Sequence, residues 1–204
     1  MDINNPIPRA WGDYVTQSAI ALEVIPDMLW DTQTYTDNVT TQLTFFGATQ
    51  AGALSNMTQP GMLPNPQSFL IECVRVFFRI QFTTDDAGGA GAFASISNDV
   101  ALLINTSQLT LNIGQKRYGP WRPWMLPAAS YPQGVLATAG AEAANLVHDY
   151  TQIGGPLWGL QPALMVSPLQ NFNVVWEWPN GAVNLTGNVV LEVMLEGKRA
   201  RAVQ

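Results

Sequence analysis

The chain has 204 residues, of which nine are Lys or Arg and fifteen are Asp or Glu, so its formal net charge is −6. This acidic balance argues against a protein whose main task is to coat nucleic acid, because phosphate binding depends on clustered cations. Charged residues form only 12% of the sequence, about half the share of a typical soluble protein. Since charge keeps free monomers apart, this composition favours assembly.

The length suits a single domain with a sizeable core, with or without an additional arm. One cysteine, Cys73, excludes an intrachain disulfide framework and suits a reducing cytoplasm, and its place in an apolar segment predicts a small buried residue. Residues 1–9 lack the pattern of a signal peptide, and no apolar stretch reaches the roughly 18 residues of a membrane helix. We therefore expect a chain made in the cytoplasm without a transmembrane segment.

Residues 1–32 carry no strand pattern. Prolines and asparagines indicate an extended lead, and the segment from Tyr14 to Val24 predicts a short helix ended by Pro26. We expect an N-terminal arm over residues 1–32 and one domain over residues 33–204.

Residues 34–46 alternate apolar and polar side chains, which predicts a half-buried strand. Residues 47–67 are rich in Gly, Pro, Asn and Gln and indicate a long excursion. The segment 69–82 is the strongest strand of the sequence, since apolar residues such as Val74 and Val76 alternate there with charged ones.

A glycine-rich turn at residues 85–91 is followed by apolar residues from Phe93 to Ile104 at helical spacing, which predicts a short helix. Residues 109–113 predict another strand, which runs into an aromatic loop at residues 118–124. Residues 128–155 show no clear strand pattern and indicate a second long excursion.

The segment 160–166 predicts an edge strand, because Pro162 interrupts it and proline is tolerated at sheet edges. Residues 172–178 alternate in the same way, and a turn at residues 179–181 leads to the last strand, Val189 to Glu196. Six to eight strands without repeated strand-helix units predict an antiparallel β-sandwich.

The sequence contains no arrangement of residues typical of a catalytic site, so we expect no enzyme activity, no cofactor and no resident metal ion. His148 is the only histidine, and no nucleophile signature accompanies it, so we interpret it as a loop residue. Asp85 and Asp86 lack the spacing of a calcium loop, which favours a polar turn and leaves cation binding open. Glu192 and Glu196 share a strand face, where outward solvation explains them at least as well as acid-base chemistry.

Tryptophan is the most site-like residue of the chain, with seven copies. Five of them could form a stacking platform for sugar rings: Trp121, Trp124, Trp158, Trp176 and Trp178. However, Trp176 and Trp178 lie in phase with apolar strand residues and point to the core. Trp121 and Trp124 are flanked by prolines in a loop, where aromatic residues serve subunit interfaces as readily as ligands. We favour packing or interface roles.

Basic residues form two groups: Lys116, Arg117 and Arg122, then Lys198, Arg199 and Arg201. A solvated loop and a solvated tail explain the two groups. The alternative is contact with the acidic surface of a neighbouring subunit.

Three passages resemble the single jelly-roll proteins of viral and bacteriophage capsids: residues 34–46, 116–127 and 195–204. The last two are similar to segments of phage structural proteins, in which a Gln-x-Phe strand like residues 170–172 follows. The resemblance implies a β-sandwich of jelly-roll type with about eight strands, long loops, one or two short helices and an N-terminal arm. It implies no catalytic residues. The arm lacks the basic cluster of many genome-binding capsid proteins, so nucleic acid is not expected as the main partner.

A jelly roll places its first and last strands side by side in one sheet. With residues 34–46 as the first strand, we expect residues 38–46 to pair with residues 188–198. A structure with these two segments in different sheets would contradict the jelly-roll prediction made with this first strand.

We expect a virion structural protein, either a capsid shell subunit or a cement protein that decorates the shell. Its partners would be further copies of itself, in trimers or larger capsomers, and other capsid proteins. The candidate interface residues lie in the arm, the aromatic loop and the tail: Ile3, Pro6, Trp11, Tyr118, Trp121, Trp124, Lys198, Arg199 and Arg201. The alternative is a carbohydrate-binding jelly roll, lectin-like or receptor-binding, that uses the loop tryptophans.

Overall fold

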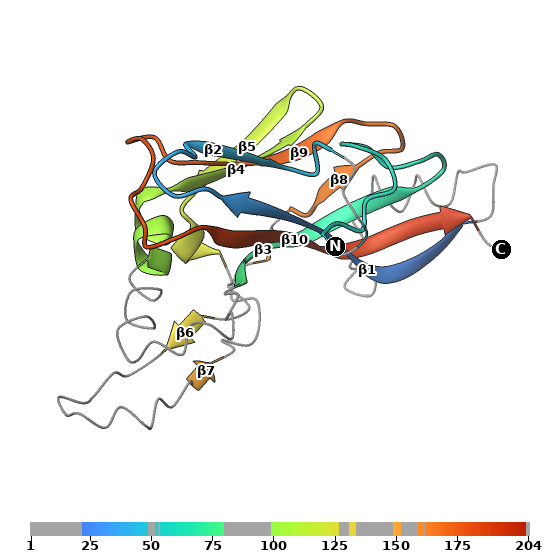
Figure 1. Cartoon of the computed structure of the whole chain (residues 1–204). Helices are drawn as coiled ribbons and strands as arrows, with labels where there is room; N and C mark the ends of the chain where they lie inside the picture. Colours follow the sequence, from blue (N-terminus) through green and yellow to red (C-terminus); the bar gives the residue numbers. More distant parts are fainter. Residues whose placement is uncertain are drawn as a thin grey trace.

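The computed structural model describes residues 22–48, 52, 54–79, 99–126, 131–133, 149–151, 159–160 and 162–202. These residues form two antiparallel four-stranded sheets that pack against each other as a sandwich (Figure 1). The predicted all-β class and antiparallel sandwich are confirmed at this level. In the described part of the chain, no helix has the length and hydropathy needed to cross a bilayer.

The first sheet has the strand order β1-β10-β3-β8, and the second has the order β2-β9-β4-β5. The strands of the first sheet are β1 (Leu22–Tyr35), β10 (Val189–Ala202), β3 (Ser68–Arg79) and β8 (Leu164–Val166). The strands of the second are β2 (Gln42–Phe45), β9 (Phe172–Glu177), β4 (Gln108–Ile113) and β5 (Lys116–Trp121). The connections contain a helix at residues 99–106, the 3-10 turn η1 (Pro123–Met125) and a separate pair of strands, β6 (Tyr131–Gln133) and β7 (Asp149–Thr151).

Alternating side chains of the two sheets meet in one core. Leu191, Val193 and Leu195 of β10 are completely buried, as are Val174 and Trp176 of β9 on the facing sheet. The strands predicted from period-two patterns at residues 69–82, 109–113, 172–178 and 189–196 are therefore confirmed within the described residues. Residues 80–82 lie outside the described part. The segment predicted as an edge strand is also confirmed, because β8 ends the first sheet.

Aromatic rings close one side of this core. Trp176 stacks on Trp178 with centroids 5.8 Å apart, and Tyr35 meets Trp178 edge-on at 4.5 Å. The indole Nε1 of Trp176 donates a hydrogen bond of 2.7 Å to Ser107 Oγ, which follows the helix at residues 99–106. Trp176 and Trp178 are core residues, as their phase along the strand predicts.

The helix predicted between Phe93 and Ile104 is confirmed over residues 99–106, where Val100, Leu103 and Ile104 are buried. Residues 93–98 lie outside the described part. Cys73 is also buried, as predicted, and burial raises the pKa of its thiol.

The start of the first sheet differs from the prediction. Residues 22–32, which we assigned to the arm, belong to β1, so the predicted helix is wrong over residues 22–24. Pro26 does not end a helix there; it lies exposed on a strand at the edge of the sheet, where its missing N–H costs no ladder bond. Residues 1–21 lie outside the described part.

The predicted pairing of the first and last strands is wrong for the residues we named. Residues 42–45 form β2, which pairs with β9 in the second sheet, whereas residues 189–202 pair with β1 and β3 in the first. The predicted strand over residues 34–46 is interrupted by a turn, in which Val39 is 71% exposed. The neighbour of the last strand is β1, which we had read as arm.

The predicted aromatic loop is also partly wrong. Residues 116–121 form β5, which pairs with β4 through a tight turn that contains Gly114 at a φ of 57°. Pro120 suggested a loop, but β5 is an edge strand, which tolerates proline.

Candidate assembly surface

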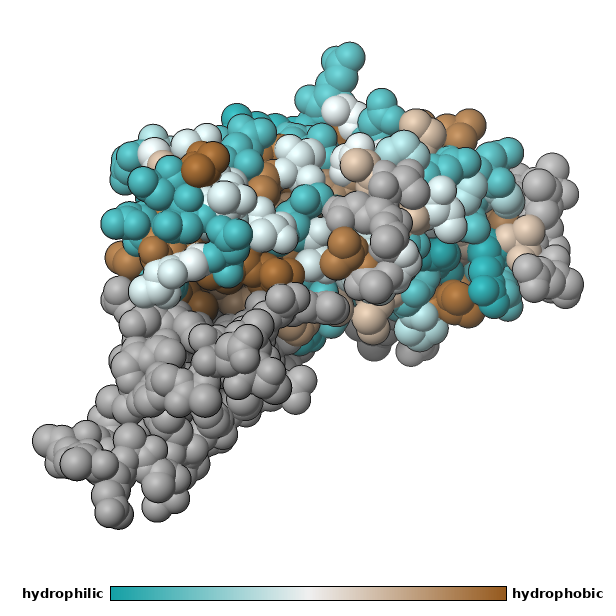
Figure 2. Space-filling model, viewed as in Figure 1, coloured by the Kyte–Doolittle hydropathy of each residue, from teal (hydrophilic) through white to brown (hydrophobic). Residues whose placement is uncertain are grey.

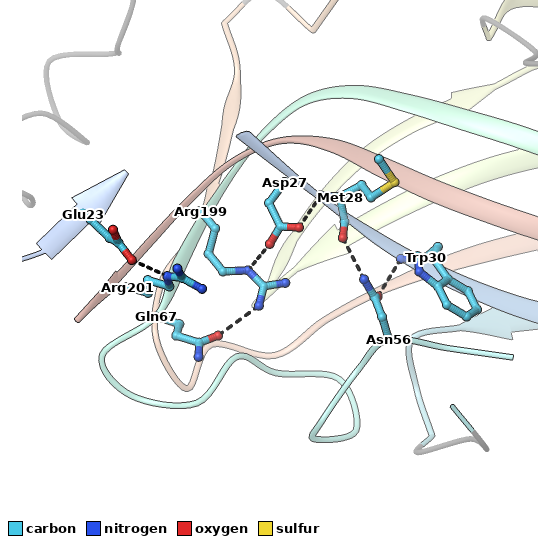
Figure 3. A network of polar contacts seen from close by, with 8 residues as sticks. All are labelled: Glu23, Asp27, Met28, Trp30, Asn56, Gln67, Arg199 and Arg201. Carbon is cyan, nitrogen blue, oxygen red and sulfur yellow. Dashed lines mark hydrogen bonds and ion pairs between the residues drawn. The ribbon is translucent and has the colours of Figure 1, made fainter. Parts of the chain in front are cut away.

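A ladder of ion pairs joins β1 to β10 at the end of the first sheet (Figure 3). Arg199 Nε lies 2.5 Å from Asp27 Oδ2, and Arg201 Nε lies 2.5 Å from Glu23 Oε1. Arg199 also donates from Nη1 to Gln67 Oε1 at 3.4 Å. The arginines that we interpreted as a solvated tail are therefore part of a strand and face acidic residues of their own chain.

The ladder continues the face of β1 and β10 that forms the core. Glu23 and Asp27 share a face with Leu29, and Arg199 and Arg201 share one with Leu195, because side chains alternate along a strand. Leu29 and Leu195 are buried and directly paired. Toward residue 22 the same face becomes charged, and the β1/β10 ribbon projects past the second sheet (Figure 1).

The opposite face of the first sheet carries its own ion pairs. Lys198 Nζ lies 3.0 Å from Glu72 Oε1, and Arg75 Nε lies 2.8 Å from Glu196 Oε2. Glu192, which we read as solvated, is only 5% exposed and accepts a hydrogen bond from Thr32 Oγ1 at 3.2 Å. Lys198, Arg199 and Arg201 thus all face carboxylates of their own chain, which lowers the net positive charge that they offer to a phosphate backbone.

The outer edge of β1 is covered by the loop that contains Asn56 (Figure 3). Asn56 Nδ2 donates to the Met28 carbonyl at 2.8 Å, and its Oδ1 accepts the Trp30 N–H at 2.9 Å. The Leu54 carbonyl accepts the Thr32 N–H at 2.8 Å. The loop therefore imitates a neighbouring strand from Met28 to Thr32 and closes this stretch of edge to strand addition.

A buried carboxylate, Asp31, ties this edge to the second sheet. Asp31 is inaccessible to solvent and accepts the Phe46 N–H at 2.5 Å, while Ser55 bonds its side chain as well. Burial raises the pKa of Asp31, and hydrogen bonds from Phe46, Ser55 and others oppose that rise. Its hydrogen bonds join β1 to the residue that follows β2 and to the loop that contains Ser55.

The aromatic residues of β5 occupy the edge of the second sheet. Tyr118 and Trp121 pair with Leu111 and Leu109 of β4, and both are half-buried against the core. Trp124 lies in η1. A platform of five tryptophans for sugar binding is therefore not assembled: Trp176 and Trp178 are inside the core.

The outward face of the second sheet is polar and mostly uncharged. Gln108 Nε2 donates to Glu177 Oε1 at 2.6 Å, and Arg117, 61% exposed, lies 3.6 Å from the same carboxylate oxygen. Asn112 and Asn173 are joined at 2.8 Å. Figure 2 shows mainly hydrophilic residues over this sheet, at the top of the view.

Several candidate residues lie outside the described part of the chain: Ile3, Pro6, Trp11, Asp85, Asp86, His148 and Trp158. Within the described residues, no group of three or more His, Cys, Asp or Glu side chains is placed to hold a metal ion.

Comparison of the chain with protein-family models, with curated proteins and with solved structures finds no match.

The acidic half of the ladder was missed by sequence reasoning. Glu23 and Asp27 lie in a stretch without period-two hydrophobicity, and only the register of β1 with β10 brings them to the arginines. The available signal was weak: Glu23 and Asp27 are separated by Val24, Ile25 and Pro26, so both acids have the same strand parity.

Proposed function

We propose that this protein is a structural subunit of a virus particle, either a jelly-roll shell subunit or a cement protein attached to the shell. The strand order is the observation that carries the proposal. The first sheet reads β1-β10-β3-β8 and the second reads β2-β9-β4-β5. The pairing that we expected failed because residues 22–35, and not residues 34–46, form the first strand. With β1 as the first strand and the small pair β6 and β7 set aside, we infer from this order a jelly roll, a fold of viral capsid proteins.

Fold alone does not imply function, so the surface has to agree with it. The charges on the surface are consistent with a protein that contacts further copies of itself. The chain has only nine Lys and Arg, and five of them, Arg75, Arg117, Lys198, Arg199 and Arg201, are paired with carboxylates. Such a surface suits contact with further copies better than contact with a phosphate backbone.

The mechanism would be repeated, symmetric burial of surface. Each contact is modest, and the closed lattice supplies avidity because every further contact within it is intramolecular. The projecting end of the β1/β10 ribbon and the half-buried Tyr118 and Trp121 on β5 are the contact regions we propose, together with the arm residues Ile3, Pro6 and Trp11.

Light scattering and electron microscopy of the purified chain test the proposal. We expect capsomers or closed particles whose abundance rises with protein concentration. A chain that stays monomeric at every concentration and never attaches to particles contradicts it.

Trp121→Ala separates assembly from sugar binding. In an assembling protein it weakens association and leaves glycan-array signals unchanged, with circular dichroism as the control for folding. Glycan binding that disappears in this variant would replace the proposal with a lectin-like role.

A further inference from the structure

The ion-pair ladder sorts its charges by strand. Glu23 and Asp27 both lie on β1, while Arg199 and Arg201 both lie on β10, and all four share one face of the ribbon. The register sets Glu23 opposite Arg201 and Arg199 opposite Ile25. An acidic stripe thus runs beside a basic stripe. We call these four residues the charge-striped face.

We propose that the charge-striped face binds the same face of a second copy about a twofold axis parallel to the strands. Such a rotation exchanges the two stripes, so the acids of β1 lie over the arginines of β10 from the other copy. A twofold axis that crosses the strands would instead place acids over acids. The equal numbers of acidic and basic residues make the face complementary to itself, the requirement for an isologous contact.

Arg201 has donors for a second carboxylate. Arg201 contacts Glu23 through Nε, and among the described residues its terminal nitrogens have no partner. A guanidinium carries five N–H donors and can hold two carboxylates. Arg201 and Glu23 are 45% and 38% exposed, which leaves both within reach of a second copy.

The contact is small. Six residues on each of two strands give a face of about 20 Å by 10 Å, well below the roughly 800 Å² per partner of a stable interface. One such contact is weak, so the inference rests on the proposed function, in which a lattice repeats it. Salt should weaken it, because the stripes are partly exposed.

A charge-swapped chain tests this contact. The variant combines Glu23→Arg, Asp27→Arg, Arg199→Asp and Arg201→Glu, which exchanges the stripes and keeps opposite charges paired within the chain. Swapped chains remain complementary to each other, whereas a mixed contact opposes like charges. With the two chains carrying different fluorophores, we expect each to associate with itself and mixed association to be at least about tenfold weaker.

A matched control swaps the pair on the other sheet, with Arg117→Glu and Glu177→Arg. These chains should mix with wild-type chains in statistical proportion. If the ladder-swapped chains also mix statistically, the charge-striped face is not a contact and the proposed function stands. If neither chain associates with itself, both proposals fail.

Circular dichroism and thermal unfolding check that the swapped chain folds. If it does not, the neutral pair Glu23→Gln with Arg201→Gln replaces it. Self-association of that variant should be weaker and should depend less on salt than wild-type association. An unchanged salt dependence overturns the inference.

Discussion

Phe46 donates its backbone N–H to Asp31 Oδ2 across 2.5 Å, and this buried hydrogen bond fixes the distance between the edges of the two sheets. Phe46 has a φ of 64°, a conformation that non-glycine residues seldom adopt. The carboxylate of Asp31 therefore holds the chain in a costly conformation immediately after β2.

Asp31 should make the stability of the fold depend on pH. Because burial raises its pKa above 3.8, the folded chain binds this proton more tightly than the unfolded chain does. Protonation of Asp31 therefore stabilises the folded state. This contribution to the unfolding free energy is complete below pH 3.8 and is lost as pH rises through the pKa of Asp31 in the folded chain. In urea denaturation at a series of pH values, the wild-type chain should lose stability as pH rises from 3.8 through this pKa, whereas Asp31→Asn should not. The unfolding free energy of the variant should therefore rise relative to that of wild type. A constant difference would show that Asp31 does not titrate there.

The buried hydrogen bond between Trp176 and Ser107 should contribute to the unfolding free energy. Ser107→Ala leaves the indole N–H unpaired in the core, so we expect a loss of about 1–3 kcal/mol in unfolding free energy. Ser107 Oγ itself donates to the Leu103 carbonyl. Thr106→Ala is the matched control, because Thr106 Oγ1 donates in the same way to the Leu102 carbonyl but lies only half-buried. Equal losses in the two variants would count against a special role for the indole bond.

Gly197 lies on β10 at the point where the pairing register between β10 and β3 shifts. A Cβ at this position would overlap the carbonyl oxygen of Leu70. Gly197→Ala should cost about 3 kcal/mol, because the backbone of β3 has to move. Gly187→Ala, where a Cβ meets no atom within 4 Å, should cost almost nothing in the same thermal unfolding experiment. Similar melting temperatures for the two variants would contradict this reading of the register.

Asn56→Ala should expose the edge of β1 without disturbing the core. The Trp30 amide loses its acceptor, so its hydrogen exchange should accelerate, with a loss of about 1–3 kcal/mol. Amides of β9, in the middle of the second sheet, serve as the internal control. Unchanged exchange at Trp30 would mean that Asn56 does not protect the edge.

Period-two hydrophobicity predicted the strands whose whole length faces the core. Residues 189–196 are an example, because Leu191, Val193 and Leu195 all meet the facing sheet. The same reasoning failed for β1. Its inward face is apolar at Leu29 but charged at Glu23, since that half of the strand projects beyond the second sheet.

Only the basic half of the ion-pair ladder could be singled out from the sequence. Arg199 and Arg201 were singled out as basic residues of an interface, but their acidic partners depend on a register between distant segments. No local pattern encodes such a register. For Tyr118 and Trp121, the prolines near them suggested a loop, although the free edge of a sheet accommodates proline equally well.

The pairing of β1 with β10 also has a consequence during synthesis. Arg201 reaches back to Glu23, 178 positions earlier in the chain. Until residues 189–202 have left the ribosome, the first sheet lacks β10. Neither the basic stripe nor the β1/β10 ribbon can then form. A nascent chain that lacks residues 189–202 therefore cannot present the charge-striped face, so the contact that we propose between two copies can form only after these residues have been synthesised.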